Sequence, residues 1–168
     1  YVSQEDFLFT ASVRENLKMG NDGITDDEMI EISHNMGVDQ FVSKMERGYD
    51  SVLEERGKNL SKGQRQKISL TRAILRHPQV LILDEATSNM DSISEREILN
   101  YIKGIQNLTL ILISHRIDVI ADSNCIYVLQ KGSIVASGTD EQLKKQCELY
   151  RQLCGEGEYI DEEEKCFN

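Results

Sequence analysis

The sequence contains Leu60-Ser61-Lys62-Gly63-Gln64 and, about one helix later, Val80-Leu81-Ile82-Leu83-Asp84-Glu85. Ser61 and Gln64 have the spacing of a capping box, so a helix should begin there, expose its first amides and end near Pro78. The apolar run that follows is typical of a strand buried on both faces of a parallel sheet. This strand ends in two adjacent carboxylates, which can supply a magnesium ligand and a base that activates water. The pattern predicts nucleotide hydrolysis on a parallel sheet.

A helical region is predicted before this stretch. Thr25 and Glu28 have the spacing of another capping box, and the helix that they start should stop at Gly37. Asp39 can cap a second, short helix that ends at Gly48. This part of the chain is therefore predicted to be polar and helical.

Further strands and helices are predicted after the carboxylates. Ser92 or Ser94 is expected to cap a helix, and Thr109 to Ile113 should form the next buried strand. Lys131-Gly132 indicates a tight turn between two strands. A third capping box starts a final helix within residues 139–153. Strands that alternate with helices predict an α/β fold.

Size and composition restrict the class of protein. A chain of 168 residues with 39% hydrophobic content can bury one ordinary core. The formal net charge of −10 argues against a nucleic-acid partner, because phosphates are bound by clustered cations. Residues 155–168 carry six acidic residues and one lysine, which predicts a disordered acidic tail. The four cysteines show no Cys-x-x-Cys spacing and are interpreted as reduced, small apolar residues.

Four motifs occur in a fixed order: Ser61-Lys62-Gly63-Gln64, Asp84-Glu85, Ser88-Asn89-Met90-Asp91 and Ile113-Ser114-His115. This order resembles the nucleotide-binding domain of an ABC transporter, and the resemblance runs from Tyr1 to about Tyr150. It implies a partial ABC ATPase domain, with a P-loop NTPase-like parallel sheet core and an inserted helical subdomain. The implied segments are 1–20, with the Gln loop and the approach to the helical subdomain; 21–59, the helical subdomain; 60–154, the signature helix and α/β catalytic core; and 155–168, the acidic tail.

The resemblance implies catalytic roles for four residues. Asp84 would bind Mg²⁺, and Glu85 would polarise the attacking water. His115 stands where the family has its switch histidine, which would contact the γ-phosphate and help to hold that water. Gln4 resembles the Gln-loop residue that reaches both Mg²⁺ and the attacking water. Taken alone, the same residues could be a solvated acidic pair, a structural histidine and an uninformative glutamine.

The resemblance also implies a set of nucleotide-binding residues, Ser61, Lys62, Gly63, Gln64 and Asp91. The family's signature reads Leu-Ser-Gly-Gly-Gln, and its serine hydroxyl, glycine amide and helix dipole would face a γ-phosphate. Lys62 replaces the first glycine, which adds a positive charge near the phosphate and removes backbone freedom. Asp91 resembles the D-loop acid that crosses to the opposite monomer. A helix N-cap is the alternative interpretation of both Ser61 and Asp91.

Two segments favour an exporter over an importer. Tyr49–Gly57 is similar to the segment that precedes the signature in exporters and contacts their coupling helices, although Glu54 stands where that pattern usually has glycine. Arg14-Glu15-Asn16-Leu17 is also similar to an exporter motif. A run of surface charge is the alternative interpretation of Tyr49–Gly57.

The phosphate-cradling pattern Gly-x-x-x-x-Gly-Lys-Ser/Thr is absent from the sequence. Because Tyr1 also lies within a motif, we expect a piece of a longer polypeptide that is inactive by itself. The parent is expected to bind ATP and Mg²⁺ and to hydrolyse ATP at the cytoplasmic face of the cell membrane. Its expected partners are a second nucleotide-binding domain, identical or different, and a transmembrane domain.

Two other interpretations remain open. A non-transport ABC ATPase of the DNA-repair or chromosome-organising type would usually carry a long heptad repeat before the signature, and no heptad run precedes Ser61. A non-catalytic module would donate only its signature face to a partner. A phosphate loop and membrane spans upstream in the reading frame would distinguish the transporter from that module.

Overall fold

The computed structural model describes residues 1–3 and 7–155. The chain divides into two compact units, of which the first runs from Tyr1 to Ile113 and the second begins at Ser114. This boundary falls inside the predicted segment 60–154, and the division into four segments stays a prediction. None of the helices formed by the described residues is long and apolar enough to span a bilayer.

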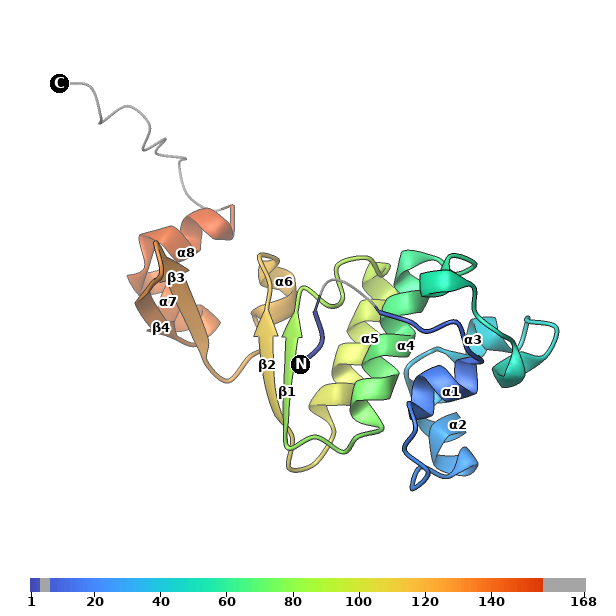
Figure 1. The fold of residues 1–168 in the computed structure, drawn as a ribbon. Coiled ribbons are helices and arrows are strands. Elements are labelled where there is room, and N and C mark those ends of the chain that lie inside the picture. The colour runs from blue at the N-terminus through green and yellow to red at the C-terminus, as the bar shows by residue number, and fades with distance from the viewer. Residues whose placement is uncertain (4–6, 156–168) are drawn as a thin grey trace. The chain divides into compact units, whose positions relative to one another are not determined.

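The first unit is a helical region followed by a β-α-β unit (Figure 1). Its elements are, in order, α1 (Val13–Lys18), α2 (Asp26–Asn35), α3 (Asp39–Val42), the 3₁₀ turns η1 (Gly48–Asp50) and η2 (Glu55–Gly57), α4 (Lys62–Ile74), β1 (Val80–Asp84), α5 (Ser92–Lys103) and β2 (Thr109–Ile113).

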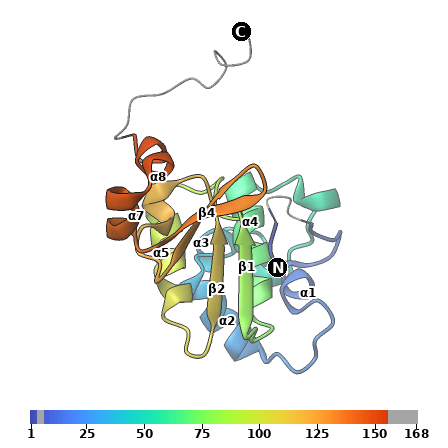
Figure 2. The same cartoon turned by 90° about the vertical axis from the view of Figure 1, so that its left-hand side faces the viewer.

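The strands β1 and β2 are parallel and in register from Val80 opposite Thr109 to Asp84 opposite Ile113. Figure 2 shows them side by side, with their carboxyl ends at the same edge. Val2 forms a further parallel bridge to Leu83. A parallel pair requires a crossover, and α5 supplies it. The predicted α/β fold is confirmed.

Figure 1 shows α4 and α5 on the same side of this sheet. Leu81 and Leu83 of β1 are 1% and 2% exposed, and the helices contribute Ile68, Ile98 and Ile102 to the buried set. Burying such aliphatic side chains stabilises a fold by about 1.5–3 kcal/mol each. This apolar layer fixes the position of β1 and therefore of the residues at its end.

The alternate residues of the two strands are more exposed than the sequence predicts. Val80, Ile111 and Ile113 are 51%, 44% and 49% exposed. Successive side chains of a strand point to opposite faces, and within this unit the two helices cover only one face. The expectation of strands buried on both faces is therefore wrong for this unit.

The predicted helix starts are confirmed to different degrees. At α4 the complete capping box forms between Ser61 and Gln64, and the helix ends before Pro78 as expected. At α2 only half of the box forms, since Thr25 accepts from the amide of Glu28. The other half fails because the Glu28 carboxylate lies 2.7 Å from His77 Nε2 instead.

Two predicted caps are wrong. Asp39 is the first residue of α3 rather than its cap, and its Oδ2 lies 2.8 Å from His34 Nδ1. The cap of α5 is Asp91 rather than Ser92 or Ser94. Asp91 has extended backbone and lies directly before the first helical residue, which is the conformation and position that a side-chain cap requires.

The second unit contains α6 (Ile117–Ile120), the antiparallel strands β3 (Ile126–Gln130) and β4 (Ser133–Gly138), α7 (Asp140–Gln146) and α8 (Glu148–Leu153). Lys131 and Gly132 both have positive φ, so the predicted tight turn is confirmed. The core of this unit is Ile126, Val128, Leu143 and Tyr150.

The final helix is shorter than predicted. The capping box at Thr139 forms, but the chain becomes extended at Cys147 and then starts α8. The break brings the Tyr150 hydroxyl to within 2.8 Å of Asp140 Oδ1, to which it donates. Ten residues of unbroken helix would instead span about 15 Å.

Candidate functional site

Asp84 is the last residue of β1 and is held by backbone pairing on both sides. Its amide donates to the carbonyl of Val2 over 2.9 Å, and β2 lies on the other side of the strand. The hydroxyl of Tyr1 donates to Asp84 Oδ2 over 2.8 Å, and this bond raises the pKa of Tyr1. The other carboxylate oxygen, Asp84 Oδ1, takes no part in this hydrogen bond.

Asp84 has the donor chemistry of a magnesium ligand, and its role as one stays a prediction. No group of three or more His, Cys, Asp or Glu side chains in the described part of the chain could hold a metal ion. Mg²⁺ is usually bound by one or two carboxylates together with phosphate oxygens and water. One carboxylate at the end of a strand meets that requirement.

Glu85 has left-handed backbone, with φ of 50°. This conformation is uncommon outside glycine and persists only where the surroundings hold it. Here the Glu85 amide donates to the carbonyl of Ile113 over 2.9 Å, and its carbonyl accepts from the amide of Ser88 over 3.2 Å. Backbone hydrogen bonds thus join Glu85 to the end of β2 and to Ser88 in the turn that follows Glu85.

The start of α4 lines an open cavity of about 410 Å³. The lining residues are Ser61, Lys62, Gly63, Gln64, Lys67, Asn89, Met90 and Asp91. All five residues predicted to bind nucleotide are in this set, so the fold brings them together across 30 positions of sequence. Two lysines and the free amides of a helix start make part of this surface suitable for an anion.

Gly63 and Lys62 meet different constraints at this helix start. A Cβ on Gly63 would lie 3.0 Å from the backbone oxygen of Asn89, so a side chain there would force the two segments apart. Lys62 is exposed, and its φ is not positive. A glycine at the second position therefore avoids a tight contact with the Asn89 backbone, whereas the first position has no positive φ that would favour glycine.

Asp91 caps α5 from the other side of the cavity. Its Oδ1 accepts from the amide of Ser94 over 2.9 Å. Hydrogen bonds from the amide and hydroxyl of Ser94 hold the pKa of Asp91 below its usual value. The helix-cap interpretation of Asp91 is confirmed, and its role toward an opposite monomer stays a prediction.

The predicted site residues therefore fall into separate groups. Asp84 and Glu85 lie together at the end of β1 and are not among the residues that line the cavity. His115 is exposed and belongs to the second unit, two residues after β2 ends. Gln4 lies outside the described residues.

A profile of the ABC transporter family matches residues 1–88, more than half of the chain. The chain belongs to the ABC transporter family. The predicted resemblance is confirmed.

Similar ABC proteins match nearly the whole of this chain. An export ATP-binding/permease protein of Rickettsia conorii is 41% identical over 157 residues, which are 93% of this chain and 27% of that protein. The heterocyst differentiation ATP-binding protein HepA of Nostoc is 42% identical over 146 residues, 86% of this chain and 24% of that protein. A solved structure of a bacterial Atm1-family ABC exporter with ATP bound is 31% identical, with a TM-score of 0.86 over 92% of this chain and 27% of that one. The chain thus spans about a quarter of the length of these relatives.

The two segments of this ABC chain that favour an exporter lie side by side. Ser12 forms an antiparallel bridge to Val52. The Val13 amide donates to Ser51 over 3.0 Å, and the Leu53 amide donates to Ala11 over 2.9 Å. These contacts lie directly before Arg14-Glu15-Asn16-Leu17. They place that motif beside Tyr49–Gly57, so the two segments form one surface.

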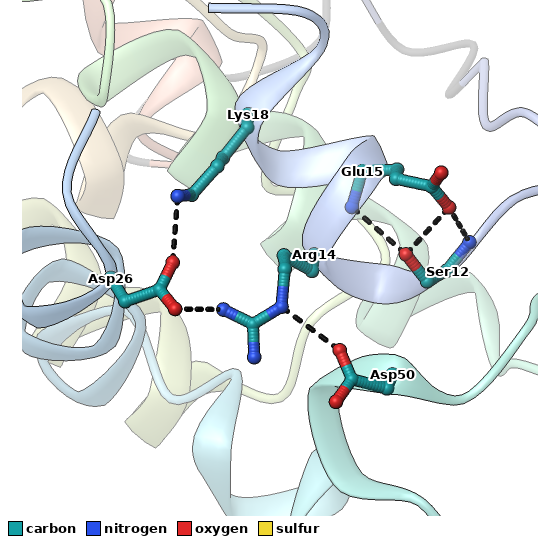
Figure 3. A network of polar contacts seen from close by, with 6 residues as sticks. All are labelled: Ser12, Arg14, Glu15, Lys18, Asp26 and Asp50. Carbon is teal, nitrogen blue, oxygen red and sulfur yellow. Dashed lines mark hydrogen bonds and ion pairs between the residues drawn. The ribbon is translucent and has the colours of Figure 1, made fainter. Parts of the chain in front are cut away.

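Ion pairs reinforce this surface (Figure 3). Arg14 lies between Asp26 and Asp50, with Nη1 2.6 Å from Asp26 Oδ2 and Nε 2.9 Å from Asp50 Oδ1. Lys18 Nζ lies 2.6 Å from Asp26 Oδ1, and Lys18 and Arg14 together lower the pKa of Asp26. These contacts connect α1 to α2 and η1.

Asn16 holds the loop before α1 and was not singled out for this by the sequence. It is 1% exposed, and its amide nitrogen donates to the carbonyls of Phe9, Ala11 and Ser12. Its Oδ1 accepts from the amide of Phe9 over 2.8 Å. The only available signal was an asparagine on the buried side of a short helix, which many sequences share.

Proposed function

We propose that this chain is the part of an ABC exporter's nucleotide-binding domain that contains the Gln loop, the signature helix and the carboxylates at the end of β1. The complete domain binds and hydrolyses ATP and couples hydrolysis to transport of a substrate across a membrane. The observation that carries this proposal is that one chain places two groups of residues of the kind that a hydrolytic site needs in separate positions. These are the carboxylates at the end of β1 and the cavity lined by two lysines at the start of α4.

The carboxylates would do the chemistry on the chain's own side. Asp84 would hold Mg²⁺, which when bound supplies positive charge to the phosphate oxygens. Glu85 would accept a hydrogen bond from the attacking water and orient it. Its attachment to the end of β2 supports this role, because a base must be positioned before its basicity matters.

The cavity would serve the nucleotide of a second nucleotide-binding domain. Ser61, Lys62, Gly63 and Gln64 would face its γ-phosphate with a hydroxyl, an ammonium group and helix amides. Asp91 would extend from the same cavity toward the partner. The exposure of Ser61, Lys62 and Asp91 supports a ligand that arrives from outside the chain.

Two further residues complete the proposed site through the family resemblance. His115 would contact the γ-phosphate, and Gln4 would reach Mg²⁺ and the water. The similarity to export ATP-binding/permease proteins supports a transmembrane domain as a partner and a position at the cytoplasmic face of a membrane. The solved exporter with ATP bound supports ATP as the nucleotide.

The test uses the full-length protein that carries this chain. Glu85→Gln should lower Mg²⁺-dependent ATP hydrolysis by about 10²–10⁴-fold while ATP binding is retained, because only the base is lost. Glu97→Gln on the exposed face of α5 is the matched control and should leave hydrolysis unchanged. A Glu85→Gln variant that loses binding and turnover in equal measure would contradict the assigned role.

A further inference from the structure

The loop from Glu85 to Asp91 joins β1 to α5 and has a proposed functional residue at each end. We call it the carboxylate loop. Glu95 of α5 holds its middle, since the Thr87 hydroxyl donates to Glu95 Oε1 over 2.6 Å and both residues are buried. The Met90 amide donates to the Thr87 carbonyl over 3.1 Å and closes a turn. These bonds fix the loop to its own crossover helix.

A second attachment joins the carboxylate loop to the signature helix. Gln66 of α4 is fully buried, and its Oε1 accepts from the amide of Asn89 over 3.2 Å. Gln66 Nε2 is buried and has no hydrogen-bond partner in the part of the chain that the structure describes. Leaving one end of a buried amide without a hydrogen bond is costly.

The contact at Gly63 lies beside this hydrogen bond. The backbone of Asn89 and Met90 packs on Gly63 so closely that a Cβ there would lie 3.0 Å from the Asn89 oxygen. Gly63 and Gln66 are three residues apart and therefore lie on the same face of α4. The first turns of the signature helix and the carboxylate loop are thus packed and bonded as one piece.

We propose that Gln66 is a positioning residue that sets the carboxylate loop against the signature helix. Its side chain is fully buried and is not among the residues that line the cavity. It acts on Glu85, at the start of the loop, and on Asp91, at its end, by fixing the Asn89 backbone between them. This inference rests on the proposed function for its catalytic consequence, but the attachment itself can be measured without hydrolysis.

Hydrogen exchange in the full-length protein tests the attachment. Gln66→Met keeps the side-chain size and removes the acceptor, so the Asn89 amide should exchange about five- to tenfold faster. Ser69→Ala is the control, because it removes another buried and unpartnered polar atom from the same helix without a link to the loop. Unchanged exchange at Asn89 in Gln66→Met would overturn the proposal. Gln66→Asn, whose shorter amide cannot reach Asn89, gives the same test if Gln66→Met does not fold.

Hydrolysis tests the catalytic consequence. Gln66→Met should lower kcat roughly tenfold and leave the KM for ATP within about twofold, because a displaced base slows chemistry more than binding. Combined with Glu85→Gln it should cause no further loss, since both changes act through the same residue. A purely structural role would add its effect in the double variant and would appear in Ser69→Ala as well, and either result would overturn the proposal. If the wild-type protein does not hydrolyse ATP, the proposed function fails while the exchange result still decides whether Gln66 holds the loop.

Discussion

The end of β1 and the cavity at the start of α4 are proposed to serve one reaction, yet they are built in opposite ways. At the end of β1, backbone hydrogen bonds to Val2 and Ile113 hold Asp84 and Glu85, and one of the two residues has left-handed backbone. At the cavity, Ser61, Lys62, Asn89 and Asp91 are exposed around a helix start whose backbone is regular. The strand end is fixed from within the chain, whereas the cavity is open to what binds it.

This difference suggests which group of residues depends on a partner. Carboxylates that orient a water need a fixed frame, because small displacements cost rate. Donors that meet a phosphate from another copy need access more than rigidity. The contrast therefore favours a site shared between two copies, with the strand end of one facing the cavity of the other.

The strongest test of this contrast combines Glu85→Gln and Lys62→Glu in a pair of differently tagged full-length copies. If each site uses the strand end of one copy and the cavity of the other, placing the changes on different copies leaves one site intact. Placing both changes on one copy damages both sites. At limiting ATP, hydrolysis should be at least about tenfold higher in the first arrangement. Higher hydrolysis when both changes are on one copy would mean that each site lies within one copy.

Lys62 tests whether the cavity serves binding rather than folding. In the full-length protein, Lys62→Glu should weaken ATP-driven association about tenfold or more, because a carboxylate would face a phosphate. Lys62→Gly restores the family's usual residue and should largely preserve association. The dimer fraction against ATP concentration at low and high salt measures both variants. A large fall in the thermal midpoint of Lys62→Gly would show instead that the lysine is structural.

Ser61 should differ from Lys62 because it also caps α4. Ser61→Ala removes the cap and should lower the free energy of unfolding by about 1 kcal/mol, whereas Ser61→Gly should cost only a few tenths. Denaturant unfolding of the two variants measures this difference. A Ser61→Ala variant as stable as the wild type would mean that the hydroxyl contributes nothing to the helix start.

Asp91 gives the smallest effect, and it is visible only in acid. Because its pKa is lower in the folded chain, it stabilises the fold above the pKa of an unfolded aspartate, and this contribution is lost as the pH falls through the folded pKa. Asp91→Asn keeps a good cap but cannot titrate, so its thermal midpoint should fall less between neutral and acidic pH. A parallel decline in the wild type and the variant would exclude a contribution from this carboxylate.

The sequence predicted features that are encoded by neighbouring residues. The Ser61–Gln64 box, the Lys131-Gly132 turn and the two parallel strands all form, because each depends on local spacing or on a short crossover. The family motifs likewise predicted the fold class. The roles of the site residues stay predictions, because they depend on a nucleotide and a partner and not on local spacing.

The features that the sequence did not predict depend on residues far apart in the chain or on backbone conformation. The left-handed backbone of Glu85 is held by Ile113, and the half-formed box at Thr25 results from His77. The break at Cys147 accompanies the bond between Tyr150 and Asp140. No local pattern contains these pairs, so only the folded chain reveals them.

The buried amide of Asn16 makes the loop before α1 depend on a single nitrogen atom. An aspartate at position 16 would replace a nitrogen that donates to three carbonyl oxygens by a carboxylate oxygen that repels them. The loop from Phe9 to Ser12 would then lose its internal support, and with it the strand-like contact between Ser12 and Val52. A change of one atom type, with almost no change in mass, would thus be enough to loosen the surface formed by the two exporter-like segments.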